Sequence, residues 1–139
     1  KKIKTREFLF NKICRNFPKR YKFAKKKVYI TLLLSNNQNI KILNKKFRNK
    51  DKHTDILSFP FDKKKRNSKN IYLGDIIISF NYMNKPKNLS NTKFKKKTIK
   101  IFIHGFLHLL GYDHVKFKDY RKMIKEEQKI FKSVEKIIN

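Results

Sequence analysis

Residues 99–110 constrain the fold more than any other part of the chain, because a helix over this segment would be apolar on nearly every side. Two of its few polar members are histidines, His104 and His108. A helix that is hydrophobic all round belongs in the interior of a domain. Residues 90–92 can cap the start of this helix, and Gly111 can end it. We therefore expect a long, buried central helix that ends just before Gly111.

The rest of the chain shows both strand and helix patterns. Apolar and β-branched runs predict strands over 28–34, 54–61 and 71–80, and apolar residues at helical spacing predict helices over about 3–17, 37–47 and 117–138. The lysine-rich residues 62–70 are expected to form a loop. Because these elements do not alternate as regular βαβ units, we expect an α+β fold, a small mixed sheet packed with about four helices mainly on one side.

Two of the predicted strands carry positional signals. Pro60 cannot donate a backbone hydrogen bond, so the strand over 54–61 should lie at an edge of the sheet or end there. The run Ile76–Ile78 indicates a strand that is buried on both faces.

The length of 139 residues is that of one domain, so residues 1–139 should form a single domain. No stretch approaches the ~18 consecutive apolar residues that cross a bilayer, and the basic N-terminus lacks an apolar segment with a cleavage site. Cys14 has no second cysteine to pair with, and it falls on the apolar side of the first predicted helix. We expect a soluble, cytoplasmic protein in which Cys14 is a buried thiol.

The net charge of +28 favours a polyanionic partner such as RNA, held through its phosphates. Only six of the 38 basic residues are arginine, however, while lysine, asparagine, isoleucine and phenylalanine abound. An AT-rich genome would impose that composition on any protein. The charge alone therefore leaves both explanations open.

The strongest chemical signal is the spacing of three histidines. His104 and His108 lie four residues apart, so on a helix their Cβ atoms would be roughly 5–6 Å apart and both imidazoles could bind one ion. Gly111 allows the left-handed conformation that turns the chain back, and His114 can then complete the site. Three protein ligands leave one position free, as in catalytic rather than structural zinc sites. The alternative is that these histidines are hydrogen-bonded core residues.

The spacing is also that of the metzincin proteases, with one decisive difference. Those enzymes need glutamate directly after the first histidine as general base, and Gly105 stands there in this chain. Peptide hydrolysis by that mechanism is therefore disfavoured. Glycine inside a helix costs about 1 kcal/mol relative to alanine, so Gly105 needs a reason. Room for a substrate beside the metal and close helix–strand packing both remain open.

The residues around the histidines form the segment HGFLHLLGYDH over 104–114. At each defined position this segment resembles the signature H-G-x-L-H-L-x-G-Y-D-H of the YbeY family of endoribonucleases. A second block agrees independently, and it consists of Leu43-Asn44, Phe47-Arg48, the run TDILSFP over 54–60 and the run LGDI over 73–76. Together the resemblance covers about residues 30–130.

The resemblance implies a zincin-like fold and a metal-dependent endoribonuclease that prefers single strands. It implies a role in rRNA maturation, notably at the 3′ end of small-subunit rRNA, and in ribosome quality control. The family's metal ligands carry over onto His104, His108 and His114, with zinc as the expected ion, and its functional arginine carries over onto Arg48. The expected partners are rRNA and the small ribosomal subunit, with no membrane and no small-molecule organic cofactor.

Arg48 and His114 are the expected catalytic residues. Arg48 suits the scissile phosphate, because its planar fork matches phosphate oxygens, although a surface salt bridge is the alternative. Asp113 could orient an imidazole or only shape the turn, while Asp55 and Asp75 are expected to make structural hydrogen bonds. The nucleophile, a metal-activated hydroxide or the 2′-OH of the substrate, stays open.

Some positions depart from the family pattern. The N-terminus lacks the strand that usually precedes the first helix, and His53 stands where proline is common. Lys100, one turn before His104, could meet a phosphate near the metal, but we expect its side chain to extend into solvent.

Two other functions remain as alternatives. One is a non-catalytic rRNA-binding assembly factor with a structural metal, and the other is a metal-dependent hydrolase of another substrate.

Overall fold

Three strands form a mixed sheet in the order β1-β3-β2 in the computed structural model, which describes residues 10–21, 27–61 and 70–138. The strands are β1 (Lys27–Ser35), β2 (Ile56–Pro60) and β3 (Asn70–Ser79). β3 runs parallel to β1 and antiparallel to β2. Ile76 and Ile78 are fully buried and Ile77 is 7% exposed, which confirms burial of the central strand on both faces.

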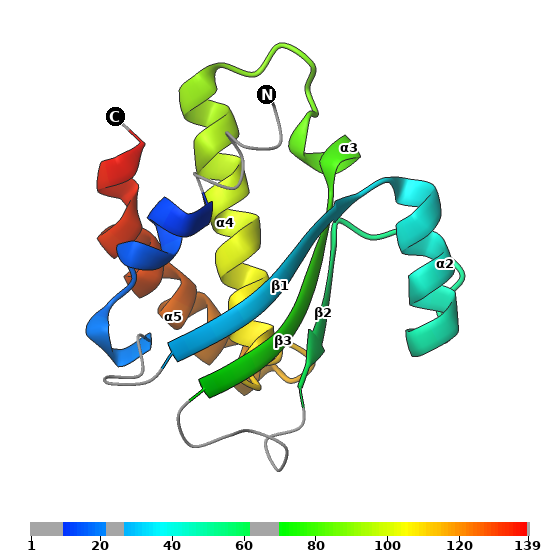
Figure 1. The fold of residues 1–139 in the computed structure, drawn as a ribbon, viewed down its shortest axis with the longest axis horizontal. Helices are drawn as coiled ribbons and strands as arrows, with labels where there is room; N and C mark the ends of the chain where they lie inside the picture. Colours follow the sequence, from blue (N-terminus) through cyan, green and yellow to red (C-terminus); the bar gives the residue numbers. More distant parts are fainter. Residues whose placement is uncertain (1–9, 22–26, 62–69, 139) are drawn as a thin grey trace.

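The helices lie on both faces of this sheet (Figure 1). They are α2 (Asn37–Arg48), the short α3 (Phe80–Met83), α4 (Asn91–Leu109) and α5 (Phe117–Val134), with 3-10 turns η1 (Lys19–Tyr21) and η3 (Glu135–Ile137). α4 and α5 cover one face together with the helical residues 10–15, and α2 lies on the other. The helices are therefore mainly, but not wholly, on one side.

The alternation along β3 explains why the two faces have separate cores. Ile76 and Ile78 point into the large core with α4, whereas Ile77 packs with Ile40 of α2 and Leu57 of β2. α4 lies at the centre of the large core, because eight of its residues are buried. Its N-cap is Ser90, whose hydroxyl accepts a hydrogen bond from the backbone N–H of Lys93 at 3.2 Å. The prediction of a buried central helix is thus confirmed.

One prediction about the first helix is wrong, because Cys14 is exposed. Residues 10–15 are helical and pack on α4 through Phe10, Ile13 and Phe17, and the ring centroids of Phe17 and Phe106 are 4.8 Å apart. The side chains that make this contact with α4 do not include Cys14, which lies next to them on the exposed side.

The predicted helical residues 3–9 and most of the predicted loop over 62–70 lie outside the described residues. Within the described ranges, no helix combines the length and apolar character needed to cross a membrane.

Candidate metal centre

His104 and His108 lie on the part of α4 that meets the ends of β2 and α5. Both side chains are half-buried, and their Nε2 atoms are 3.1 Å apart. The helix therefore brings two imidazole nitrogens to one point, as the four-residue spacing predicts. Tetrahedral zinc with Zn–N bonds of about 2.0–2.1 Å would hold two such nitrogens about 3.3 Å apart.

The third histidine reaches the same point through a turn at the end of α4. Gly111 has a φ of +98°, which favours glycine, and the backbone N–H of Tyr112 donates to Leu107 O at 3.1 Å. The Asp113 carboxylate accepts the backbone N–H of His114 at 2.7 Å. Asp113 therefore shapes the turn. One ligand atom from each of His104, His108 and His114 lies within 4.8 Å of the others.

Hydrogen bonds set the orientation of the two helical imidazoles. His104 Nδ1 lies 2.7 Å from Glu127 Oε1, and His108 Nδ1 lies 2.9 Å from the backbone carbonyl oxygen of Tyr112. The Glu127 carboxylate and the Tyr112 carbonyl can only accept a hydrogen bond, so in each histidine the Nδ1 atom carries the proton that is donated. In neutral rings the two Nε2 lone pairs then face each other at 3.1 Å, an arrangement that a cation between them would stabilise. This donor set fits a divalent metal ion.

The protonation state of His108 agrees with this fit. Burial lowers the pKa of His108 below its usual 6.5, and the neighbouring His104 and His114 lower it further. Hydrogen bonding to Tyr112 O and the charge of Asp113 act in the opposite direction without reversing the shift. His108 is therefore neutral at pH 7, and the neutral imidazole is the form that binds metals.

The three imidazoles line a cavity of about 520 Å³. Its wall includes the end of α2 and the segment that leads into β2, with three basic side chains, Arg48, Lys50 and Lys52. Asp113 is the one acidic residue among the lining residues that the structure describes. The cavity thus combines a nitrogen donor set with an excess of positive charge, which suits an anionic substrate.

Comparison with known proteins decides the family. The family model described as Endoribonuclease YbeY matches residues 1–135. A protein named Endoribonuclease YbeY from Pelagibacter ubique (strain HTCC1062) is 63% identical over 134 residues, which are 96% of this chain and 88% of that protein. The chain belongs to the YbeY endoribonuclease family.

A second protein of the YbeY family and one solved structure are also similar to this chain. A protein of the same name from Persephonella marina is 38% identical over 108 residues, 77% of this chain and 71% of that protein. The solution structure of TM1509 from Thermotoga maritima has 27% sequence identity and a TM-score of 0.53, and the match covers 92% of this chain and 79% of that one.

Arg48, which matches the arginine of the YbeY motif, is exposed at the end of α2 and lines the same cavity as the three histidines, which we call the metal cavity because it contains the candidate metal ligands. Asn49 follows in the left-handed conformation, with a φ of 56°, and turns the chain towards Lys50 and Lys52. Within residues 10–21, 27–61 and 70–138, no carboxylate forms an ion pair with Arg48. The salt-bridge alternative therefore finds no support in this part of the chain.

Gly105 of the YbeY signature is explained by packing. A Cβ at this position would lie 2.5 Å from Ile56 Cδ1 and 3.1 Å from Ser58 Oγ, and the Ser58 hydroxyl donates to Gly105 O at 3.0 Å. The helix backbone thus lies directly against β2. Of the two reasons that the sequence leaves open, close helix–strand packing is the one that the structure supports, and no side chain fits at 105 without movement of its neighbours.

The remaining predicted residues lie outside the cavity. Lys100 Nζ is 5.3 Å from the ring centroid of Phe131, so this side chain turns towards α5. Asp75 accepts a hydrogen bond from the Tyr72 hydroxyl, and the backbone carbonyl of Asp55 accepts the N–H of Ser79 at 2.9 Å. Glu127 was not predicted. Its contact with His104 spans 23 residues of sequence, and nothing in the local pattern of the closing helix distinguishes it.

Proposed function

We propose that this chain is a metal-dependent endoribonuclease that cleaves single-stranded rRNA in the cytoplasm, including the 3′ end of small-subunit rRNA, where it acts on the small ribosomal subunit. His104, His108 and His114 bind one divalent ion, which we propose to be zinc. Arg48 binds the scissile phosphate. Membership of the YbeY family supports the activity on RNA, and the histidine cluster supports the metal.

One observation carries the proposal: three convergent imidazoles share one cavity with Arg48, Lys50 and Lys52. Imidazole nitrogens in a set of three are typical ligands of catalytic zinc. The basic side chains would attract and hold a phosphodiester beside that ion. Three histidine ligands leave one coordination position open for water or substrate, as in catalytic zinc sites. The arrangement therefore favours catalysis over the alternative of a non-catalytic rRNA-binding assembly factor with a structural metal.

His104, His108 and His114 would hold the divalent ion, which would supply a Lewis acid able to polarise a phosphoryl oxygen and to lower the pKa of a water molecule. The chain's own residues supply position and charge. Arg48 can donate two parallel hydrogen bonds to the phosphate oxygens and remains charged throughout the reaction. Glu127 and the carbonyl of Tyr112 keep the Nε2 atoms of His104 and His108 free of protons and directed into the cavity.

The proposal is tested with labelled small-subunit rRNA that carries an unprocessed 3′ end, incubated with the purified protein with and without a chelator. His114→Ala and Arg48→Ala should abolish or strongly reduce cleavage while the circular dichroism spectrum stays unchanged. Arg48→Lys should restore little of the rate, since lysine keeps the charge but lacks the fork. His53→Ala is the matched control, because His53 is exposed and does not line the cavity.

The same preparations separate the parts of the proposal. Zinc content measured by mass spectrometry should be near one ion per chain in the wild type and in Arg48→Ala, and should fall in His114→Ala. Cleavage that persists at the wild-type rate in chelator and in both variants would refute the nuclease assignment at this site. A wild-type protein that binds no divalent ion on reconstitution would refute the metal assignment.

A further inference from the structure

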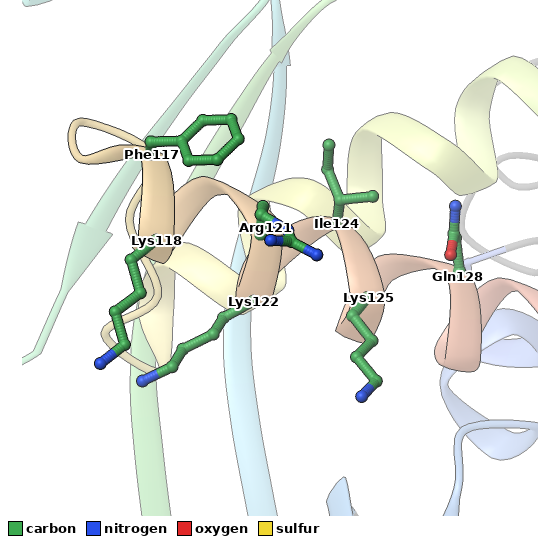
Figure 2. A pocket seen from close by; sticks show the side chains of 7 residues that line it. All are labelled: Phe117, Lys118, Arg121, Lys122, Ile124, Lys125 and Gln128. Carbon is green, nitrogen blue, oxygen red and sulfur yellow. The ribbon is translucent and has the colours of Figure 1, made fainter.

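The exposed face of α5 carries a second groove, with a volume of about 510 Å³, that is lined by residues of this helix (Figure 2). α5 turns Met123, Glu126, Ile130 and Val134 inwards, and the groove lies on the outward face. We infer that single-stranded RNA passes from the metal cavity onto this groove, with a base stacked on Phe117 and its phosphates against the neighbouring lysines. This inference rests on the proposed function for the identity of RNA as the substrate.

The groove has one apolar edge and one basic edge. In Figure 2 the side chains of Phe117 and Ile124 project to one side of the helix, whereas Lys118, Lys122 and Lys125 project to the other. Residues 117 and 124 are seven apart, and residues 118, 122 and 125 are three or four apart, so helical geometry keeps each set in its own row. A nucleotide has the matching division into an apolar base and a charged phosphate.

Phe117 has the properties of a stacking platform. Its side chain is 75% exposed at the first position of α5, so both faces of the ring are open to a ligand over most of their area. The guanidinium carbon of Arg121 lies 5.9 Å from the centroid of its ring, one helical turn away. A base placed on the ring would therefore meet both an aromatic face and a cation. Stacking on aromatic side chains is the sequence-tolerant way in which proteins hold single strands.

The charges around the groove favour phosphate. Its lining residues include four cations, Lys118, Arg121, Lys122 and Lys125, and no acidic residue. The carboxylates of α5 lie elsewhere: Glu126 accepts a hydrogen bond from Tyr21 and Glu127 from His104, while Asp119 does not line the groove. An RNA backbone that lies along this row would release counterions, which makes binding favourable and dependent on salt.

The groove is close enough to the metal cavity for one strand to contact both. Val115 is 83% exposed and lines the metal cavity, and Phe117 follows two residues later. Three peptide steps of 3.80 Å limit the Cα separation of His114 and Phe117 to about 11 Å. A membrane surface is a poorer match, because a helix that lies in a membrane interface needs a broad apolar face, and this face has one exposed ring and a half-buried Ile124.

A single tryptophan at position 117 tests the inference directly. The chain contains no tryptophan, so in Phe117→Trp the fluorescence excited above the tyrosine band reports this position alone. The measurement uses a short single-stranded oligoriboadenylate in the presence of chelator, so that RNA binds without being cut. We expect saturable quenching in Phe117→Trp and none in the matched control Tyr29→Trp, whose position on β1 is also exposed, at 48%.

A second set of variants measures the contribution to affinity by fluorescence anisotropy of labelled RNA. Phe117→Ala should weaken binding about tenfold, as expected for the loss of one base stack, and Phe117→Tyr should retain it. Lys118→Gln and Lys122→Gln should each reduce the slope of log K against log salt by about 0.7 for a single strand. None of these variants should alter cleavage of a minimal phosphodiester such as bis-p-nitrophenyl phosphate, which reaches only the metal cavity.

The outcomes separate this inference from the proposed function. If RNA binds but leaves the fluorescence of Phe117→Trp unquenched, or quenches Tyr29→Trp equally, the inference that a base stacks at position 117 is refuted. That result would stand even if the protein cleaves RNA. A response of Phe117→Trp to anionic phospholipid vesicles but not to RNA would overturn it in favour of a membrane surface. Quenching with the predicted loss in Phe117→Ala would support it even if no cleavage were found, in which case the proposed function alone would fail.

Discussion

Glu127 of α5 accepts a hydrogen bond from His104 Nδ1 of α4 at 2.7 Å, and this contact ties the closing helix to the candidate metal centre. Both side chains are partly exposed, at 28% for His104 and 31% for Glu127, so the pair lies at the wall of the site rather than in the core. The carboxylate fixes which nitrogen of His104 carries the proton and increases the basicity of the other.

We predict that Glu127→Ala weakens zinc affinity about 10- to 100-fold without unfolding the protein, because His104 loses the partner that orients it. Glu127→Gln should have a smaller effect, since its amide oxygen can still accept the hydrogen bond. Competition with a chromogenic chelator measures the affinity. The control is Glu135→Ala, which removes an exposed carboxylate at η3. Equal zinc affinity in Glu127→Ala and the wild type would show that the contact does not support the metal.

The sequence predicts those features of the centre that depend on one helix and its end. The four-residue spacing of His104 and His108, and the left-handed Gly111, are local geometry and could be inferred without any tertiary contact. Glu127 and the burial of Glu126 could not, because both depend on how α5 lies against the rest of the fold. Cys14 was placed wrongly for the same reason, since helical spacing alone does not show where the edge of a packed face falls.

Glu126 makes a buried polar contact that stability and pH can test. Burial by itself would raise the pKa of Glu126, but the Tyr21 hydroxyl, Arg20 and Lys129 together hold it below the usual 4.5. The folded state therefore binds the proton less readily than the unfolded chain. The stabilisation is complete above pH 4.5, and it is lost as the pH falls through the lowered pKa of the folded state.

We predict that Glu126→Gln lowers the free energy of unfolding by about 2 kcal/mol at neutral pH, the usual range for a hydrogen bond to a charged group. The difference from wild type should shrink as the pH falls well below 4.5, where both proteins carry a neutral side chain. Urea unfolding across this pH range measures it. Tyr21→Phe removes the hydroxyl partner and should show a loss with the same pH trend. A constant difference at all pH values would contradict the charged state assigned to Glu126.

The packing of Gly105 against β2 gives a prediction about α4. We expect Gly105→Val to destabilise the fold by about 2 kcal/mol, because the added atoms overlap Ile56 and Ser58 and overpacking carries a cost of this order. The double variant Gly105→Val/Ile56→Ala should recover part of that loss relative to Ile56→Ala alone, and a double-mutant cycle in urea isolates the coupling. Additive losses would place the cost in the helix backbone instead of in the contact with Ile56.

Asn44 of α2 holds the segment that brings Lys50 and Lys52 to the cavity. Its side chain is 2% exposed, its Nδ2 donates to Lys52 O at 2.8 Å, and its own backbone carbonyl accepts the N–H of Lys50 at 3.2 Å. The side-chain hydrogen bond ties the segment to the helix across eight residues of sequence. It therefore contributes to placing Lys50 and Lys52 in the cavity that the three histidines line.

We predict that Asn44→Leu, which keeps the branched shape of the side chain but cannot donate, lowers the free energy of unfolding by about 1 kcal/mol, because Lys52 O loses its partner. The apparent KM for single-stranded RNA should rise with zinc affinity unchanged, since a looser segment holds phosphate less well while the three histidines stay in place. Asn49→Gly is the matched control, because glycine adopts the same left-handed conformation, at a φ of 56°, without strain. A fall in zinc affinity in Asn44→Leu would mean that α2 and the metal centre are coupled in a way that these hydrogen bonds do not explain.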